Sequence, residues 1–246
     1  GNEQEYHFKV LFKVLTKLGF DQAKKCFHLS YGMVELPEGK MKSREGNVVD
    51  ADDIMQEMSD VAREVAAEQG KLEGIDESEK SKLYDLIGMG ALKYFLLRVN
   101  PTKNMLFDPK ESIDFNGNTG PSIQYTYVRT CAILRRLEEE GQHAIGAIKT
   151  EYFRDVVIEQ SAIEVMVKLH DWPTILSEAA SSYDPSIIAG YSYELARLFN
   201  AFYQDCPILR EADREKRNLR LVITKLTGHY LQRSMAILGI DMPERM

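Results

Sequence analysis

The sequence predicts a mainly α-helical protein with a short α/β portion at its start. Beyond residue 49, apolar residues recur at helical spacing almost without interruption. The run 26–36 instead has the apolar and aromatic content of a β-strand. Prolines stand near expected helix starts or in expected connections, where they break no helix. These observations favour one short α/β unit followed by a set of packed helices.

The composition is that of an ordinary globular protein of one to two domains. The 246 residues are 44% hydrophobic and 28% charged, and no window offers about 18 uninterrupted apolar residues for a membrane span. The first twenty residues follow a helical period, unlike the apolar block of a signal peptide. The three cysteines are far apart and outside any CxxC pair, and the five histidines are dispersed. We therefore expect a cytoplasmic protein without a metal site.

Charge is distributed unevenly along the chain. The net charge is −7, yet residues 205–233 contain seven Lys or Arg against four acids, whereas residues 57–79 are predominantly acidic. Binding to a polyanion follows the local field and not the total charge. The sequence therefore does not exclude a nucleic-acid partner.

The first elements along the chain are a helix and a strand. Residues 5–18 form an amphipathic pattern that Gly19 ends, and the strand over 26–36 is followed by a turn at 37–39. A lone helix and strand cannot close a doubly wound sheet. We therefore expect this region to be part of a larger α/β domain, and packing against the rest of the chain is the alternative.

Two longer helices and an irregular segment come next. We predict a helix from 54 to about 70, a loop over 70–80 and a helix over 81–99 that Asn100 and Pro101 end. The Gly88-Met89-Gly90 string follows no strand and opens no helix, so we assign it to close helix packing instead of dinucleotide binding. Residues 101–118 are rich in Pro, Asn, Asp and Gly and mark a domain boundary.

A helical bundle should form the rest of the chain. Its first helix begins at residues 119–121, with Pro121 near N1, and further helices are predicted over 152–170, 172–182, 185–204 and 211–238. The last helix carries one apolar stripe that must dock on its neighbours, formed by Leu219, Val222, Ile223, Leu226 and Tyr230.

Residues 40–46, KMKSREG, place three cations within five residues before a glycine, a composition that suits a polyphosphate. Taken alone, such a heptamer is more often solvated surface. The longer run 28–53 resembles the signature-loop region of class I aminoacyl-tRNA synthetases, in the arginyl-tRNA synthetase form K-[MF]-K-[ST]-R-x-G. Residues 1–8 resemble a string that lies late in the Rossmann catalytic domain of that family.

The resemblance implies roles for the basic loop. Lys40, Lys42 and Arg44 would stabilise charge on the departing pyrophosphate in the transition state, and Ser43 and the amides around Gly46 would help to hold ATP. ATP with Mg is the implied cofactor of the full-length enzyme, and we expect none tightly bound here. Because the chain has no H-[IVL]-G-H motif, we expect this polypeptide alone to be inactive.

Residues 116–129, NGNTGPSIQYTYVR, resemble the GP-x-x-QY-x-x-x-R opening of the helical anticodon-binding domain of the same family. At 100° per residue, Tyr125 and Arg129 share a face opposite the stripe that begins at Ile123 and Tyr127. The resemblance implies that the pair contacts unstacked anticodon bases, although an aromatic at helical spacing is more often core. Ser122 stands where the family commonly has a tyrosine.

The end of the chain carries a third resemblance, from residue 184 through the tail 238–246, LGIDMPERM. In the family this tail lies by the anticodon site, which makes Tyr203 and Met246 candidate RNA contacts. The basic run 210–220 includes Arg217 as a candidate phosphate contact. Arg–Glu ion pairs along one helix are the alternative for this run, and a place in a hydrophobic layer is the alternative for Tyr203.

The resemblance covers nearly the whole chain and implies a domain order. Residues 1–53 would end a Rossmann-type α/β catalytic domain, residues 54–115 would be a helical connector, and residues 116–246 would be a helical-bundle anticodon-binding domain. The implied function is that of a C-terminal fragment of arginine–tRNA ligase, monomeric, with tRNA(Arg) and the missing N-terminal catalytic half as partners. A stand-alone RNA-binding module and a helical scaffold without an RNA role are the alternatives.

Overall fold

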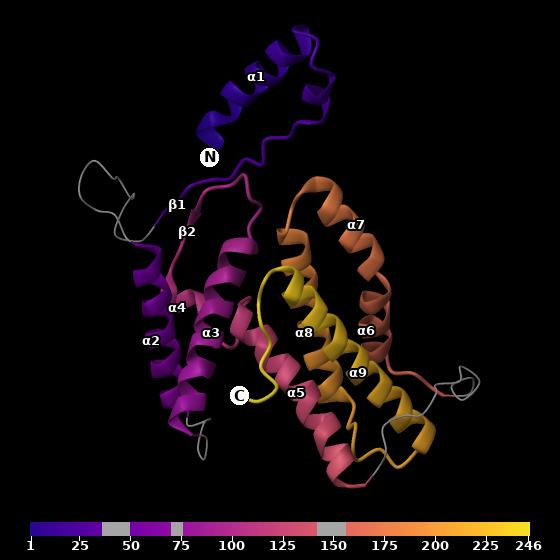
Figure 1. Ribbon diagram of the computed structural model, residues 1–246. Coiled ribbons are helices and arrows are strands. Elements are labelled where there is room, and N and C mark those ends of the chain that lie inside the picture. Colours follow the sequence, from indigo (N-terminus) through magenta and orange to yellow (C-terminus); the bar gives the residue numbers. More distant parts are fainter. Residues whose placement is uncertain (36–49, 70–75, 142–155) are drawn as a thin grey trace.

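The protein is described by a computed structural model over residues 1–35, 50–69, 76–141 and 156–246. Figure 1 shows α1 standing at one end, α2 and α3 side by side, and α5 to α9 gathered in a bundle. The predicted mainly α fold class is confirmed. Among the described residues, no helix combines the length and the apolar content needed to cross a membrane.

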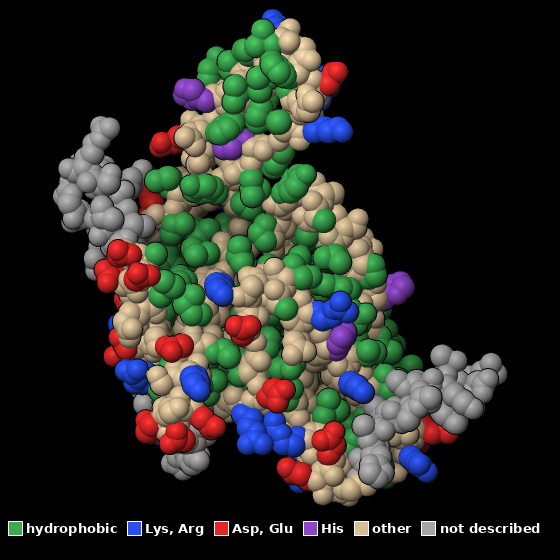
Figure 2. Space-filling view, in the orientation of Figure 1, with side chains coloured by type: hydrophobic (Ala, Val, Ile, Leu, Met, Phe, Trp, Pro, Cys, Tyr) green, Lys and Arg blue, Asp and Glu red, His purple; other side chains and the backbone are tan. Residues whose placement is uncertain are grey.

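The first helix, α1 (Glu5–Lys17), follows a short 3-10 turn (Asn2–Gln4) and ends close to where the sequence predicts. Gly19 adopts φ of 89°, the left-handed conformation that ends helices. Figure 2 shows hydrophobic side chains over this end of the molecule, and the exposed ones on α1 and at its C-cap include Tyr6, Val10, Leu11, Val14 and Leu18.

The strand predicted over 26–36 is wrong in length. A second 3-10 turn (Asp21–Lys25) precedes an extended segment, and of the described residues 26–35 only β1 (Val34–Glu35) forms a ladder, parallel to β2 (Met105–Leu106). The preceding backbone groups find other partners: the Gly32 amide donates to the Pro101 carbonyl at 2.6 Å, and the Met33 amide donates to Asn104 Oδ1 at 2.8 Å. Residues predicted as irregular thus supply both the second strand and these acceptors.

The connector consists of α2 (Ala51–Gln69), α3 (Glu77–Leu97) and the short α4 (Pro109–Ser112). The start predicted for α3 at residue 81 is wrong by four residues, because the Asp76 carboxylate accepts from the Ser78 amide at 3.2 Å and caps the helix earlier. These elements enclose their own apolar core, formed by Met58, Ala62, Ile87, Ala91, Phe95, Phe107 and Ile113.

The packing role predicted for Gly88 and Gly90 is confirmed. A Cβ atom on Gly88 would lie 2.7 Å from the Met58 carbonyl oxygen of α2, and one on Gly90 would collide with the Gln124 side chain of the next helix. The two glycines therefore let α3 approach α2 on one side and the bundle on the other.

The bundle contains α5 (Gly120–Glu139), α6 (Gln160–His170), α7 (Trp172–Ser182), α8 (Ser186–Asp205) and α9 (Arg214–Ile237). The predicted helix over 152–170 is shorter at its start, since residues 156–159 are not helical and 152–155 lie outside the described residues. The core includes large side chains such as Tyr191, Leu195, Phe199, Phe202, Leu231 and Met235. Tyr94 of α3 also belongs to it, so α3 serves both cores, and the domain boundaries at 53 and 115 stay predictions.

The stripe predicted on α9 is only partly correct. Leu219, Val222 and Ile223 are buried, but Leu226 is 42% exposed. The buried face is centred instead on Arg220, Thr224, Thr227 and Leu231, where the threonine hydroxyls donate to carbonyls of their own helix. Such self-satisfied hydroxyls can face a core at little cost, which an apolar pattern does not reveal.

Candidate nucleic-acid interface

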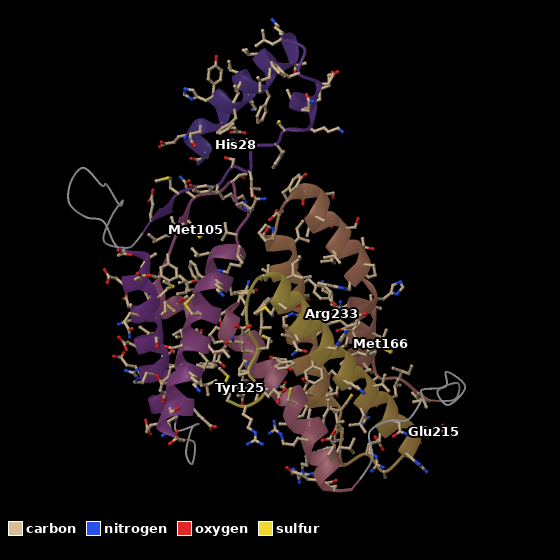
Figure 3. All side chains as sticks on the ribbon, viewed as in Figure 1. His28, Met105, Tyr125, Met166, Glu215 and Arg233 are labelled. Carbon is tan, nitrogen blue, oxygen red and sulfur yellow. The ribbon has the colours of Figure 1, made fainter. Side chains whose placement is uncertain are left out.

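Three predicted site residues meet at the junction of α5 and α8. The guanidinium carbon of Arg129 lies 5.2 Å from the Tyr125 ring centroid and 5.0 Å from the Tyr203 ring centroid. Figure 3 marks the position of Tyr125 on α5. These distances are those of cation–π contacts. We call Tyr125, Arg129 and Tyr203 the arginine–tyrosine cluster.

The cluster is oriented from its buried side. A guanidinium nitrogen of Arg129 donates to Asn200 Oδ1, and Asn200 Nδ2 donates to Thr126 Oγ1 at 3.0 Å. Thr126 is fully buried and donates in turn to the Ser122 carbonyl at 3.0 Å. Because each partner is fixed by the next, the Arg129 guanidinium has a defined orientation.

Tyr203 is the exposed member of the cluster. Its side chain is 41% exposed, while its ring also stacks near the buried Phe199 at a centroid distance of 6.5 Å. Packing in a hydrophobic layer, the alternative role for Tyr203, therefore explains only the part of the ring that lies against Phe199. The remainder faces solvent and the groove described next.

A groove of about 640 Å³ adjoins Tyr203. Its lining comes from α5, the end of α8 and the segment before α9, and consists of Ile133, Arg136, Glu140, Tyr203, Gln204, Pro207, Ile208, Leu209 and Arg210. Arg136 and Arg210 are exposed cations, although Arg136 pairs with Glu140 at 3.3 Å. The groove thus combines an aromatic ring, an amide side chain and cations, which are the groups that bind unstacked bases and phosphates.

Met246 packs against the connector core, as Phe115 also does, at the end of a tail that follows α5. Tyr203 instead lies against Phe199 of the bundle core. Gln124 Nε2 donates to the Asp241 carbonyl at 2.9 Å, and Arg135 donates to the Glu244 carbonyl at 3.0 Å. The role predicted for Met246 remains a prediction.

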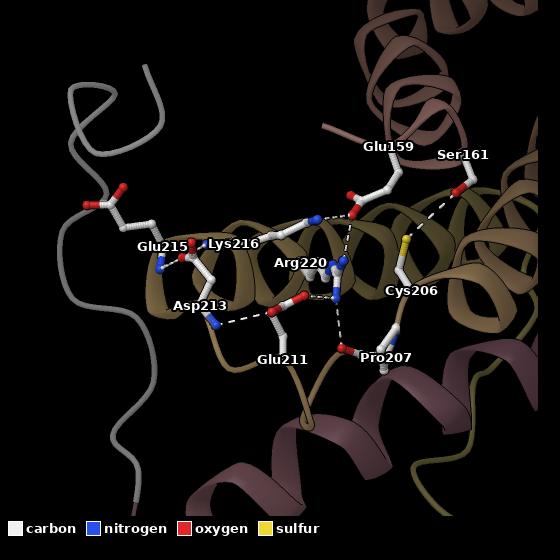
Figure 4. A network of polar contacts seen from close by, with 9 residues as sticks. All are labelled: Glu159, Ser161, Cys206, Pro207, Glu211, Asp213, Glu215, Lys216 and Arg220. Carbon is white, nitrogen blue, oxygen red and sulfur yellow. Dashed lines mark hydrogen bonds and ion pairs between the residues drawn. The ribbon is translucent and has the colours of Figure 1, made fainter. Parts of the chain in front are cut away.

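The basic run 210–220 divides into structural and solvent-facing cations. Arg220 is only 3% exposed and pairs with Glu159 at 2.6 Å and with Glu211 at 2.8 Å, as Figure 4 shows. Lys216 pairs with Glu159 as well, at 2.6 Å. For these two cations the ion-pair alternative is correct, except that the pairs join different segments instead of following one helix. Arg217 is half-buried on α9, and its phosphate contact remains a prediction.

The predicted ATP-loop residues Lys40, Lys42, Ser43, Arg44 and Gly46 lie outside the described residues. Within the described part of the chain, no three His, Cys, Asp or Glu side chains come together as a metal site would require.

Sequence reasoning missed several groups that contact the cluster or line the groove. Asn200 lies three residues before Tyr203 on the same helix, a spacing that places both on one face, and Arg136 lies seven residues after Arg129. These two helical spacings could have identified Asn200 and Arg136 from the sequence. Gln204 follows Tyr203 on α8 itself, whereas Arg210 reaches the groove because the chain turns after α8, and no periodic pattern encodes that turn.

Comparison with protein families identifies the class of protein, a class I aminoacyl-tRNA synthetase with a helical anticodon-binding domain. Residues 123–246 match the family described as "DALR anticodon binding domain", and residues 1–109 match "tRNA synthetases class I (R), catalytic domain". The chain belongs to the arginyl-tRNA synthetase family.

Individual relatives agree with this membership. Over its full length the chain is 48% identical to an arginine–tRNA ligase of Porphyromonas gingivalis and 50% identical to one of Phocaeicola vulgatus. It spans 40% of the length of each.

A solved arginyl-tRNA synthetase of Thermus thermophilus superposes with a TM-score of 0.83 at 26% identity, over 97% of this chain and 39% of that one. The enzyme of Plasmodium falciparum gives a TM-score of 0.78 at 22% identity, over 99% and 40%, and supports the fold. The family predicted from the sequence is therefore confirmed.

Proposed function

We propose that residues 116–246 bind the anticodon arm of tRNA(Arg). The observation that carries the proposal is the Arg129 guanidinium held within about 5 Å of two tyrosine rings, one of which, Tyr203, lines the groove. Tyr203 offers an exposed ring on which a splayed base can stack, and Arg210 offers a cation to the adjoining phosphates. The membership in the arginyl-tRNA synthetase family supports tRNA(Arg) as the RNA.

The whole protein, on this proposal, joins arginine to its tRNA in the cytoplasm as a monomer, using ATP and Mg. Lys40, Lys42 and Arg44 would meet the charge that develops on pyrophosphate, with Ser43 and the Gly46 backbone holding the ATP phosphates. Since the 246 residues lack the H-[IVL]-G-H motif, we expect no ATP–pyrophosphate exchange from them alone.

The test is a titration of a fluorescent hairpin RNA that carries an arginine anticodon, followed by anisotropy. The chain should bind it more tightly than the same hairpin with an unrelated anticodon, and affinity should fall as salt rises because phosphate contacts release counterions. Equal affinity for both hairpins would favour a general RNA-binding module. Absence of binding would favour a scaffold, and either result would overturn the proposal.

A matched pair of tyrosine variants sharpens this test. Tyr203→Ala removes the exposed groove ring and should cost about 1–3 kcal/mol of binding free energy, the range for one stacked base. Tyr6→Ala removes a ring that is 75% exposed on α1, far along the chain from the groove, and should leave the affinity unchanged.

A further inference from the structure

One wall of the groove is a segment without helix or strand. It runs between Asp205, where α8 ends, and Arg214, where α9 begins, and it contributes Pro207, Ile208, Leu209 and Arg210 to the lining. Ile208 is buried at 3% exposure, whereas Arg210 is exposed. An irregular segment keeps one shape only if its backbone polar groups and its ends have fixed partners.

Arg220 supplies these partners from beneath the segment. One guanidinium nitrogen donates to the Pro207 carbonyl at 2.9 Å and lies 2.8 Å from a Glu211 carboxylate oxygen, so it reaches both ends of the wall. The other nitrogen donates to Glu159, the N-cap residue of α6, at 2.6 Å. Figure 4 shows the guanidinium at the centre of this network. Only the planar fork of arginine presents donors in these directions at once.

Glu159 remains ionised beside Arg220, and Glu211 is anchored by a further hydrogen bond. Burial by itself would raise the pKa of Glu159, but hydrogen bonds from Lys216 and Arg220 lower this pKa to about 2. Glu211 also accepts from the Asp213 amide at 3.1 Å, and Asp213 caps α9 through the Glu215 and Lys216 amides. The wall is therefore tied to the first turn of α9.

We propose that Arg220 is a positioning residue for the groove, which holds segment 207–211 so that Arg210 faces the bound RNA. The inference rests on the proposed anticodon binding for its functional part. At 3% exposure Arg220 does not itself reach a phosphate, so it affects RNA affinity indirectly, by fixing the position of the wall. Its contacts with the wall exist without RNA.

The first experiment measures hydrogen exchange of the amides of residues 208–211 without RNA. Arg220→Gln should accelerate this exchange. Glu211→Ala, which removes the ion pair with Arg220 and the acceptor of the Asp213 amide but leaves Arg220 in place, should do so even if Arg220→Gln folds poorly. Ser234→Ala is the matched control, because it removes a buried 2.8 Å hydrogen bond to Ser192 between α8 and α9 without touching the groove. If the wall exchanges no faster in the two test variants than in the control, Arg220 does not hold it and the inference is wrong.

The second experiment is a double-mutant cycle for binding of the arginine-anticodon hairpin. Arg210→Ala should weaken binding about fivefold in the parent chain and hardly at all in the Arg220→Gln or Glu211→Ala background, because a released wall no longer presents Arg210. Additive effects would overturn the positioning role. If the parent chain binds no hairpin, the proposed function fails, while the exchange measurement still decides whether Arg220 holds the wall.

Discussion

Arg129 on α5 and Tyr203 near the end of α8 are joined by a cation–π contact of 5.0 Å. The contact ties the two helices together beside the groove, and Asn200 fixes the guanidinium from below. A planar cation and an aromatic ring that are ordered before RNA arrives cost little further conformational entropy on binding. On the proposed function, the cluster would therefore bind stacked bases at a lower entropic cost than a flexible surface, which would have to be ordered first.

The first prediction concerns this geometry. Arg129→Lys keeps the positive charge but loses the planar guanidinium, so it should weaken binding of the arginine-anticodon hairpin by about 1 kcal/mol, or roughly fivefold. The measurement is the same anisotropy titration, repeated at two salt concentrations. Because the charge is retained, the salt dependence should stay as in the parent chain. An affinity equal to that of the parent would show that charge alone matters at this position.

Helical spacing predicted the parts of the site that lie on one helix. Tyr125 and Arg129 share a face because they are four residues apart, and the structure adds a contact of Arg129 with Tyr203 that helical spacing does not predict. The bounds of α7 match the prediction over 172–182, where Pro173 marks the first turn. In both cases the local sequence was sufficient to predict the structure.

What the sequence did not predict depends on contacts between distant segments. Gly32 and Met33 do not join the strand, because their amides donate to Pro101 and Asn104, which lie far along the chain. Arg220 was included in a basic run that suggests RNA phosphates, yet it is buried among acids from two other segments. Periodicity reports which face of an element is buried, but it does not report which distant group satisfies a charge.

The second prediction compares two glycines in helix interiors. Gly88→Ala would place a Cβ atom 2.7 to 2.9 Å from backbone atoms of Met58 and Ser59, so it should destabilise the fold by about 1–3 kcal/mol. Gly190→Ala is the control, because a Cβ atom there meets nothing within 4 Å, and the better helix propensity of alanine should stabilise by about 0.5–1 kcal/mol. Urea unfolding measures both. Equal effects of the two substitutions would contradict the close approach of α3 to α2.

The third prediction concerns the link between connector and bundle. The fully buried Tyr94 hydroxyl lies 2.6 Å from Asn118 Oδ1 and 3.1 Å from the Ala189 carbonyl of α8, and burial raises the pKa of this phenol, so it stays a donor. Tyr94→Phe keeps the ring but leaves these acceptors without the donor, and it should cost about 1–2 kcal/mol. Thermal unfolding measures the loss. The same substitution at Tyr6, exposed on α1, should leave the melting temperature unchanged.

The fourth prediction follows from the ionised Glu159. Its pKa in the folded protein, about 2, lies well below its ordinary value, because the hydrogen bonds from Lys216 and Arg220 outweigh the opposing effect of burial. A carboxyl group whose pKa falls on folding stabilises the protein above its unfolded-state pKa, and this contribution disappears as pH drops through the folded-state value. Glu159 should therefore contribute at most about 3 kcal/mol near neutral pH, and most of this should be lost between about pH 4.5 and pH 2.

Urea unfolding of the parent chain and of Glu159→Gln across this pH range measures that contribution. The variant should be less stable at pH 6, and the difference between the two should shrink steadily as pH falls towards 2, since the parent carboxylate becomes protonated and loses its charge. Lys216→Met removes one of the two side-chain hydrogen bonds that lower the pKa of Glu159, so its pH dependence should lie between those of the parent and Glu159→Gln. A difference that stays constant with pH would mean that Glu159 stabilises the fold through packing instead of charge.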